Sequence, residues 1–223
     1  MKKLFTLLTA ALLTTSAFAQ TTFTTNIAVN AAVPDNDPSG VARGFSLSGL
    51  TGVITNVTVD LNVSGGYNGD LFAYLTGPGG YAVLLNRVGV TSANPNGYGN
   101  PGLAVTFLSG GADIHSYGAG GFTTNSLGQL TGTWGVDGRA ISPYSSGSTF
   151  DLTGRTALLT SFIGTNPNGT WGLFIGDYAN GDISTLLAYA VSITTVAVPE
   201  PGTLALLAGG GALLLAARRK NSA

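Results

Sequence analysis

The sequence lacks several residue types that common protein functions require. It has no cysteine and a single histidine among 223 residues. The absence of cysteine excludes disulfides, thiolate metal sites and a cysteine nucleophile, and one histidine excludes a metal site built from several histidines of one chain. Charged residues make up only 9% of the chain, against about 25% in ordinary domains. A nucleic-acid-binding surface, which needs clustered Lys and Arg, is therefore not expected.

The few charges are unevenly placed. Between residues 4 and 199 the chain has four Arg and nine Asp but no Lys and no Glu, a formal charge of −5. Glycine is abundant instead, with 34 residues. Because Lys and Glu favour helices, Thr favours strands, and Gly and Asn favour turns, this composition favours an all-β fold.

The first 19 residues have the three regions of a secretory signal peptide. Lys2 and Lys3 form the positive start, residues 4–13 form an apolar core, and Ala17-Phe18-Ala19 is an A-x-A cleavage site. The apolar run is too short for a stable transmembrane span. We therefore expect export through the Sec translocon and a mature chain that begins at Gln20.

The last 26 residues have the features of a second targeting signal. Val198-Pro199-Glu200-Pro201 is followed by an apolar run over residues 203–217, and then by the basic residues Arg218, Arg219 and Lys220. As a helix the run would reach about 22 Å, less than the roughly 30 Å hydrocarbon core. We therefore expect a short, marginal transmembrane helix. Its basic end would stay cytoplasmic, which leaves the body on the far side of the inner membrane.

This end resembles the PEP-CTERM sorting signal of Gram-negative bacteria, with motif, short span and basic tail in order over residues 198–223. The resemblance implies processing by an exosortase, transient anchoring in the inner membrane, and a final location at the cell surface or outside the cell. Because such tails commonly occur in bacteria that make extracellular polysaccharide, it also implies polysaccharide or surface proteins as partners. The alternative is a permanent C-terminal anchor.

Residues 20–198 are predicted to form one domain of short strands and tight turns. Residues 53–64 alternate between apolar and polar, which is typical of a half-buried strand. Residues 71–85 predict a hairpin that turns at Gly77-Pro78-Gly79-Gly80, whereas residues 93–147 predict long loops with one or two strands. Further strands are expected at 103–108, 157–163, 171–175 and 186–193. Many short strands with this spacing favour a sandwich or barrel.

The body also resembles the P/Homo B domain, which follows the catalytic domain of proprotein convertases and many bacterial subtilases. The matching segments are 33–41, 54–62, Gly69-Asp70-Leu71, 75–80, 84–87, 168–173 and 186–193; Gly77 and Ala188-Tyr189 depart from the family pattern. The resemblance implies a jelly-roll β-sandwich that packs against a protease and stabilises it. An accessory module of a secreted subtilisin-like protease system is therefore one alternative function.

No residue pattern predicts an enzyme. A Ser-His-Asp triad would have to use His115, which lies in a Gly-rich segment without a subtilase-like serine motif, so we expect an exposed loop residue. A glycosidase pair would need two of nine Asp, and nothing selects a pair. No catalytic domain fits between residues 19 and 33. We therefore expect a non-catalytic binding or structural module in the envelope or exopolysaccharide matrix.

Calcium is the site hypothesis that the sequence favours. Ca²⁺ takes six to eight oxygen ligands from carboxylates, amides and backbone carbonyls on bent loops. If the first and last strands approach each other, Asp35 and Asp37 would converge with Asp177 and Asp182, and Asp70 would be a weaker contributor. The alternative is that these residues serve turns through hydrogen bonds from side chain to backbone.

The two tryptophans lead to different expectations. Trp171 alternates with Leu173 and Ile175, so it is expected in the core. Trp134 has two interpretations. It either packs within a loop or forms a platform for sugar rings beside Tyr98, Tyr117 or Tyr144, as in a carbohydrate-binding module.

Overall fold

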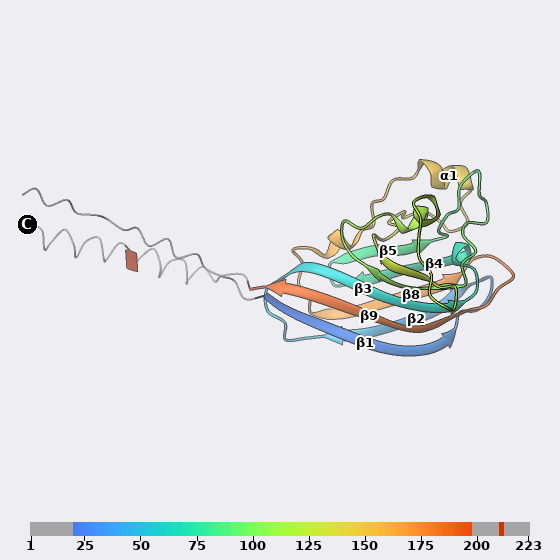
Figure 1. The fold of residues 1–223 in the computed structure, drawn as a ribbon. Coiled ribbons are helices and arrows are strands. Elements are labelled where there is room, and N and C mark those ends of the chain that lie inside the picture. Colours follow the sequence, from blue (N-terminus) through green and yellow to red (C-terminus); the bar gives the residue numbers. More distant parts are fainter. Residues whose placement is uncertain (1–19, 198–209, 212–223) are drawn as a thin grey trace, which may run out of the picture.

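The computed structural model describes residues 20–197 and 210–211. Nine strands form two sheets that stack as a β-sandwich (Figure 1), which confirms the predicted all-β, jelly-roll-like fold. One sheet has the order β1-β9-β3-β6-β7 and the other the order β2-β8-β4-β5. The strands are β1 (Gln20–Ala32), β2 (Asp37–Leu47), β3 (Val53–Gly65), β4 (Leu71–Gly77), β5 (Gly80–Asn86), β6 (Gly102–Phe107), β7 (Leu130–Trp134), β8 (Gly169–Asp177) and β9 (Ser184–Val196).

The chain closes on itself in a nested order. The first strand pairs with the last, and the second pairs with the one before the last; both pairs are antiparallel. Gln20 lies directly opposite Val196, so β1 begins and β9 ends at the same end of the sandwich, on the left in Figure 1. The predicted signal peptide, residues 1–19, lies outside the described residues. The predicted sorting signal, residues 199–223, also lies outside them, apart from residues 210–211. Among the described residues, no helix is long and apolar enough to cross a membrane.

The core lies between the sheets and follows the alternation in the sequence. In β3, the side chains of Val57, Val59, Leu61 and Val63 are all 1% exposed or less. Trp171 of β8 is fully buried, as predicted, and its Nε1 donates to the carbonyl oxygen of Pro167 at 2.9 Å. Large aromatic side chains in such a core bury much apolar area, so they contribute strongly to stability.

The predicted hairpin over residues 71–85 is confirmed as β4 and β5. The strand predicted at 157–163 is wrong, because this segment contains the 3₁₀ helix η3 (Leu159–Phe162). Leu159 and Phe162, three residues apart, both point into the core, which suits one helical turn. The hydroxyl of Ser161 accepts from the N–H of Tyr81 at 3.0 Å and donates to its carbonyl oxygen at 2.8 Å. The Ser161 side chain thus makes the hydrogen bonds to the backbone of β5 that a neighbouring strand would otherwise make.

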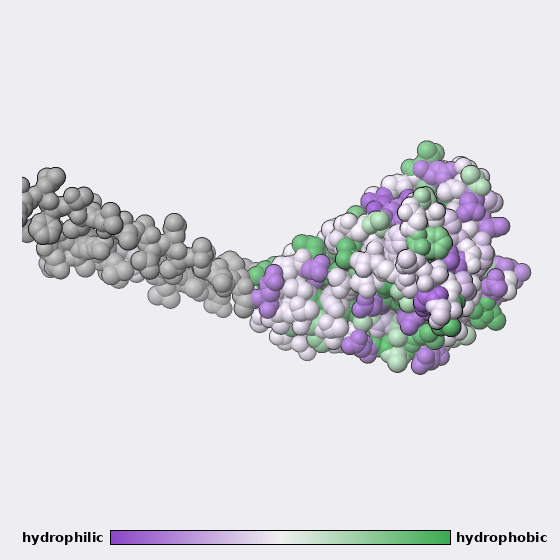
Figure 2. Space-filling view, in the orientation of Figure 1, coloured by the Kyte–Doolittle hydropathy of each residue, from purple (hydrophilic) through white to green (hydrophobic). Residues whose placement is uncertain are grey.

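Strand β1 was not predicted from the sequence. Three further short elements are η1 (Asn68–Asp70), η2 (Ile114–Ala119) and α1 (Gly147–Leu152). Figure 2 shows that one face of the molecule consists mostly of pale, weakly polar residues, with purple and green residues scattered among them. This surface agrees with a composition in which Thr, Ser, Asn and Gly replace charged residues.

Candidate functional site

Four carboxylates gather at the end of the sandwich opposite Gln20 and Val196. Asp35 lies in the turn after β1, Asp70 ends η1, and Asp177 ends β8; Asp182 lies in the turn before β9. The Oδ1 atom of Asp35 accepts from the N–H of Gly181 at 3.0 Å, which ties the two turns together. We call Asp35, Asp70, Asp177 and Asp182 the acidic corner. The sequence predicts that Asp35, Asp177 and Asp182 approach one another, and it predicts Asp70 as a weaker contributor to the same site.

Asp177 is the most buried member of the acidic corner, with no exposed surface. Its Oδ1 atom accepts from the N–H of Ala179 at 3.1 Å, but its Oδ2 atom is buried without a hydrogen-bond partner. Burial raises the pKa of the Asp177 carboxyl against the opposing effect of the backbone N–H groups of Ala179 and Asn36, and the negative charge of Asp35 raises it further. A buried carboxylate oxygen without a partner is costly, which agrees with the direction of this pKa shift.

Asp70 experiences the field of the other three carboxylates. Its side chain is 10% exposed, and its Oδ1 atom lies 3.7 Å from a guanidinium nitrogen of Arg87. Burial and the charge of Asp177 raise the pKa of Asp70 to about 6, against the opposing effect of Arg87. The charges of Asp182 and Asp35 raise it further. One arginine therefore does not compensate the negative charge collected here.

Asp37, the remaining predicted ligand, pairs with Asp177 across β2 and β8, and its side chain is engaged in a turn. Its Oδ1 atom accepts from the N–H of Ser39 at 2.8 Å, and this hydrogen bond lowers the pKa of the Asp37 carboxyl. This geometry is the turn role that the sequence left as the alternative. Within the described part of the chain, no three His, Cys, Asp or Glu side chains are arranged to hold a metal ion. A calcium ion at the acidic corner would therefore take most of its oxygens from backbone carbonyls and water.

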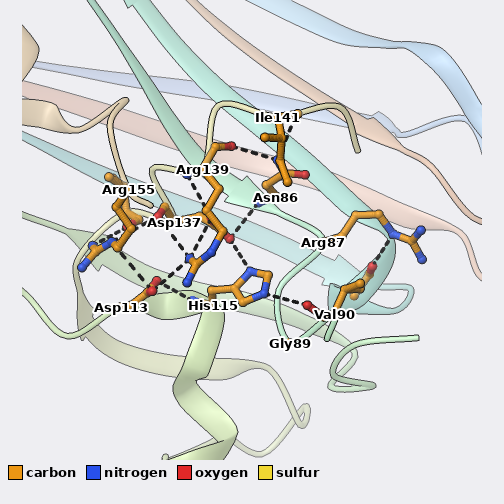
Figure 3. Close-up of polar contacts among 12 residues, drawn as sticks. Asn86, Arg87, Gly89, Val90, Asp113, His115, Asp137, Arg139, Ile141 and Arg155 are labelled. Carbon is orange, nitrogen blue, oxygen red and sulfur yellow. Dashed lines mark hydrogen bonds and ion pairs between the residues drawn. The ribbon is translucent and has the colours of Figure 1, made fainter. Parts of the chain in front are cut away.

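A second polar cluster surrounds the buried carboxylate of Asp137 (Figure 3). His115, expected as an exposed loop residue, is only 3% exposed, so that expectation is wrong. Its ring stacks on Phe150 with 5.4 Å between the ring centroids. Its Nδ1 atom lies 2.6 Å from Oδ2 of Asp137, and its Nε2 atom lies 3.0 Å from the carbonyl oxygen of Val90. Both ring nitrogens therefore lie within hydrogen-bonding distance of protein oxygens.

Two arginines complete this cluster. Arg139 donates to Oδ2 of Asp113 at 2.9 Å and to Oδ1 of Asp137 at 3.2 Å, while Arg155 donates to the carbonyl oxygen of Val136 at 2.6 Å. Asp137 itself has no exposed surface. Because η2, the loop after β7 and the end of β5 all contribute, the cluster holds the long loops against the sandwich. Sequence reasoning missed it, since Asp137 stands in a Gly-rich segment without periodicity.

Aromatic rings cover part of the outer face of the four-stranded sheet. Neighbouring ring centroids lie 5.0–5.8 Å apart in a connected group, in which Tyr81 is 38% exposed and Tyr144 is 62% exposed. We call this group the aromatic surface; it consists of Phe72, Tyr74, Tyr81, Tyr144, Phe174 and Tyr178. Beside it lies an open groove of about 320 Å³. Gly44 and Gly172, which pair across β2 and β8, belong to its lining.

Three rings considered for a sugar platform lie together, since the ring centroid of Tyr117 is 6.1 Å from that of Trp134 and 4.4 Å from that of Tyr98, but they are packed instead of presented to solvent. Tyr117 is 1% exposed, and its hydroxyl donates to Oδ1 of Asn100 at 2.9 Å. Trp134 packs against the core and donates from Nε1 to the carbonyl oxygen of Thr131 at 3.0 Å. Tyr144 lies instead against Tyr178 in the aromatic surface. The packing interpretation of Trp134 therefore agrees with the structure.

The acidic corner predicts a specific pH dependence of stability. Between about pH 4 and pH 6, folded Asp70 keeps a proton that the unfolded chain releases. The stability that this proton contributes is present below pH 4 and lost as the pH rises through about 6. In chelator, Asp70→Asn should therefore gain stability over the native protein by up to about 3 kcal/mol from pH 4 to pH 8. Urea unfolding at a series of pH values measures this difference.

The matched control for that experiment is Asp37→Asn, because a hydrogen bond from the N–H of Ser39 lowers the pKa of the Asp37 carboxyl. The stability of this variant relative to the native protein should therefore not rise between pH 4 and pH 8. If the relative stability of Asp70→Asn does not rise either, the pKa of Asp70 is not raised in the folded protein.

Comparison with known proteins identifies a sorting motif at the C-terminal end of the chain. Residues 197–220 match the family model of the PEP-CTERM protein-sorting motif. No curated protein sequence matches the chain. Among solved structures, the chain is similar to a serine protease of Aeromonas sobria alone (16% identity, TM-score 0.44, 81% of this chain) and in complex with its chaperone (16% identity, TM-score 0.45, 82% of this chain). The chain spans 28% of the matched chain in each case. Directly after β9, the protein thus carries the sorting motif of an exported protein that an exosortase processes at the cell envelope.

Proposed function

We propose that the protein is a non-catalytic binding and structural module, which is released at or attached to the cell surface after sorting and acts in the extracellular polysaccharide matrix. The aromatic surface carries this proposal. Exposed aromatic rings are enriched where proteins bind partners, because one side chain offers both apolar area and a polar tip. The flanking groove is lined by glycines, by Thr76 and Thr170, and by one charged residue, Arg43. A mostly uncharged groove with hydroxyl groups suits sugar rings, which combine apolar faces with hydroxyl groups.

Two further observations support a module without catalytic chemistry. The one histidine has both ring nitrogens engaged by Asp137 and Val90. The buried carboxylate of Asp137 is bonded to Arg139, so it is held in an ion-paired cluster instead of facing a cleft. General acid–base catalysis needs a group within reach of a substrate proton, and the polar cluster around Asp137 offers none.

Binding through the aromatic surface can be tested with its two most exposed members. In the exported protein, Tyr81→Ala with Tyr144→Ala should lower co-sedimentation with the polysaccharide of the producing culture at least tenfold, because few aromatic residues dominate most interfaces. Leu127→Ala is the control, since Leu127 is 69% exposed outside the aromatic surface and should bind normally. Protease treatment of the matrix beforehand distinguishes a polysaccharide from a surface protein. Unchanged sedimentation of the tyrosine variant would refute this surface as the binding site.

The sorting step predicts a defined loss of mass. The motif begins at residue 197, one residue after β9 ends, and Ala197 is exposed, so an enzyme can reach the chain beyond the sandwich. Intact-mass analysis of surface or supernatant protein should show cleavage near Val198–Pro201 and loss of Arg218, Arg219 and Lys220. Replacing Pro199, Glu200 and Pro201 by alanine should preserve the tail. Full-length native protein outside the cell would favour the permanent anchor.

The acidic corner supports a calcium site as part of this module. The buried Oδ2 atom of Asp177 has no partner, and the raised pKa of Asp70 reports uncompensated negative charge. A cation bound there would coordinate the Oδ2 atom of Asp177 and offset the negative charge around Asp70. Carboxylates with added carbonyl and water oxygens are the ligands that Ca²⁺ prefers, and extracellular calcium would reach this end of the sandwich because Asp182 and Gly181 are exposed.

A calcium titration of thermal stability tests this site. A ligand at a hundredfold excess over Kd stabilises the native state by about 2.7 kcal/mol, which is several degrees for a protein of this size. The melting temperature should therefore rise between chelator and millimolar calcium. Asp177→Asn and Asp182→Asn should remove the rise, while Asp37→Asn should keep it. A melting temperature that does not respond to calcium would leave these residues with turn roles only.

A further inference from the structure

The two sheets have four edges, and three of them are protected against pairing with another chain. The edge of β5 is occupied, since Val83 donates to the carbonyl oxygen of Ala157 at 3.0 Å and accepts from Gly138 at 2.9 Å. Strand β7 has only five residues, and Thr131 donates to the carbonyl oxygen of Thr123 at 2.9 Å. Natural proteins use short strands, covering segments and charges in this way to avoid edge-to-edge association.

The edge of β2 is protected by its sequence. It contains Pro38, which cannot donate a ladder hydrogen bond. It also contains Arg43, which alternates in phase with the buried residues Val41 and Leu47 and so belongs to the inward-facing side of the strand. An inward-pointing charge on an edge strand is a recognised device against pairing, because a second strand would bury it.

Strand β1 has none of these protections. It is 13 residues long and contains no charged residue, no Pro and no Gly. It pairs with β9 along one side, and within residues 20–197 no segment pairs with its other side. Its one irregularity is a bulge between Ala28 and Ala31, where Asn30 has a φ of 50°. This bulge lies near the end of the strand, so the pairing of residues 20–28 is regular. A long strand of this kind presents a row of backbone donors and acceptors that fits another strand.

Apolar side chains are also accessible along this side of the sandwich. Phe23, Ile27 and Val29 of β1 are only partly buried although they pack against the core. Phe23 stacks with Phe45 of β2 at 6.4 Å between ring centroids, across the gap between the two sheets. A partner strand added to β1 would therefore bury apolar area as well as pair backbone groups.

We propose that β1 of one copy pairs antiparallel with β1 of a second copy, so that two five-stranded sheets join across a two-fold axis. A second copy fits because the strand is uncharged and does not repel itself. Its exposed residues Thr22, Thr24 and Asn26 alternate with the partly buried Phe23 and Ile27. An isologous antiparallel pair then matches polar with polar and apolar with apolar side chains on each face.

The direction of the strands couples this assembly to processing, a step that rests on the proposed exosortase sorting. Gln20 and Val196 lie at one end of each copy. In an antiparallel pair the corresponding ends lie on opposite sides of the axis, about 44 Å apart for fully overlapping strands of 13 residues. Because the two Val196 positions lie at opposite ends of the pair, one flat membrane cannot adjoin both of them. Copies therefore pair after the tail has been removed.

Because the chain has no cysteine, disulfide trapping tests the proposal cleanly. Thr22→Cys, Thr24→Cys, Asn26→Cys and Ala28→Cys each place one thiol on the exposed side of β1. Directly opposed residues of an antiparallel pair have Cα atoms about 4.5–5.5 Å apart, within the range of a disulfide. In the processed protein, mild oxidation should link at least one of these variants almost completely into dimers. Ser46→Cys, exposed on the edge strand β2, should stay monomeric.

A second measurement does not depend on a thiol. The processed native protein should sediment as a dimer, and Thr24→Lys with Asn26→Lys should weaken its association at least tenfold by like-charge repulsion across the strand pair. Two lysines at the exposed β2 positions Ala42 and Ser46 are the matched control and should leave the dimer intact. Processed protein that sediments as a monomer at high concentration overturns the proposal. So does a β1 lysine variant that dimerises normally, while unprocessed protein that dimerises overturns only the coupling to sorting.

Discussion

The insertion of β9 between β1 and β3 is the constraint on which the rest of the sandwich depends. Along almost its whole length β9 pairs with both neighbours, so the last strand joins the first strand to the remainder of its sheet. Pairings between residues as distant as Gln20 and Val196 require the closure of a very long loop, which has an entropic cost. The sorting motif follows β9 at once. The sheet is therefore complete only when nearly all of the body has crossed the membrane.

The scarcity of positive charge decides how the polar groups are arranged. Of the four arginines between residues 20 and 197, Arg139 and Arg155 lie with Asp113 and Asp137, and Arg87 faces Asp70. In the loops near Asp137, two arginines thus face two carboxylates. In the acidic corner, one arginine faces four carboxylates. This imbalance, rather than the number of Asp residues alone, distinguishes the cluster around Asp137 from an acidic corner with uncompensated negative charge.

The elements that could be predicted from sequence are those with local signals. Residues 53–64 alternate strictly, and Gly77-Pro78-Gly79-Gly80 marks the hairpin turn, so β3, β4 and β5 were identified. The apolar segment 157–163 predicts a strand. One helical turn is more favourable there, because it places Leu159 and Phe162 in the core and allows Ser161 to bond to the backbone of Tyr81. Strand β1 is rich in Thr, and its partner lies at the far end of the chain, so nothing nearby in sequence reveals it.

The candidate site was predictable to the same extent. Asp35, Asp177 and Asp182 are clustered with turn residues, and their approach follows once the first and last strands pair. The burial of Asp177 and the field on Asp70 depend on how β4 and β8 lie side by side, which no local pattern contains. His115 was misjudged for the same reason. Its Gly-rich neighbourhood indicates a loop, whereas its burial comes from Asp137, Val90 and Phe150, which are distant in sequence.

A nearly uncharged surface also limits how the sheet edges can be protected. Proteins rich in Lys and Glu can place charges on every exposed edge, but the described part of this chain has no Lys and no Glu. Three of its arginines face Asp side chains, which leaves Arg43 as the arginine outside the ion pairs, and it lies on β2. Strand β5 is covered by the loops that Asp137 holds in place. The bare edge of β1 is therefore a consequence of the same composition that made the fold recognisable as all-β, and in a secreted module it gives copies of the protein a surface through which to associate.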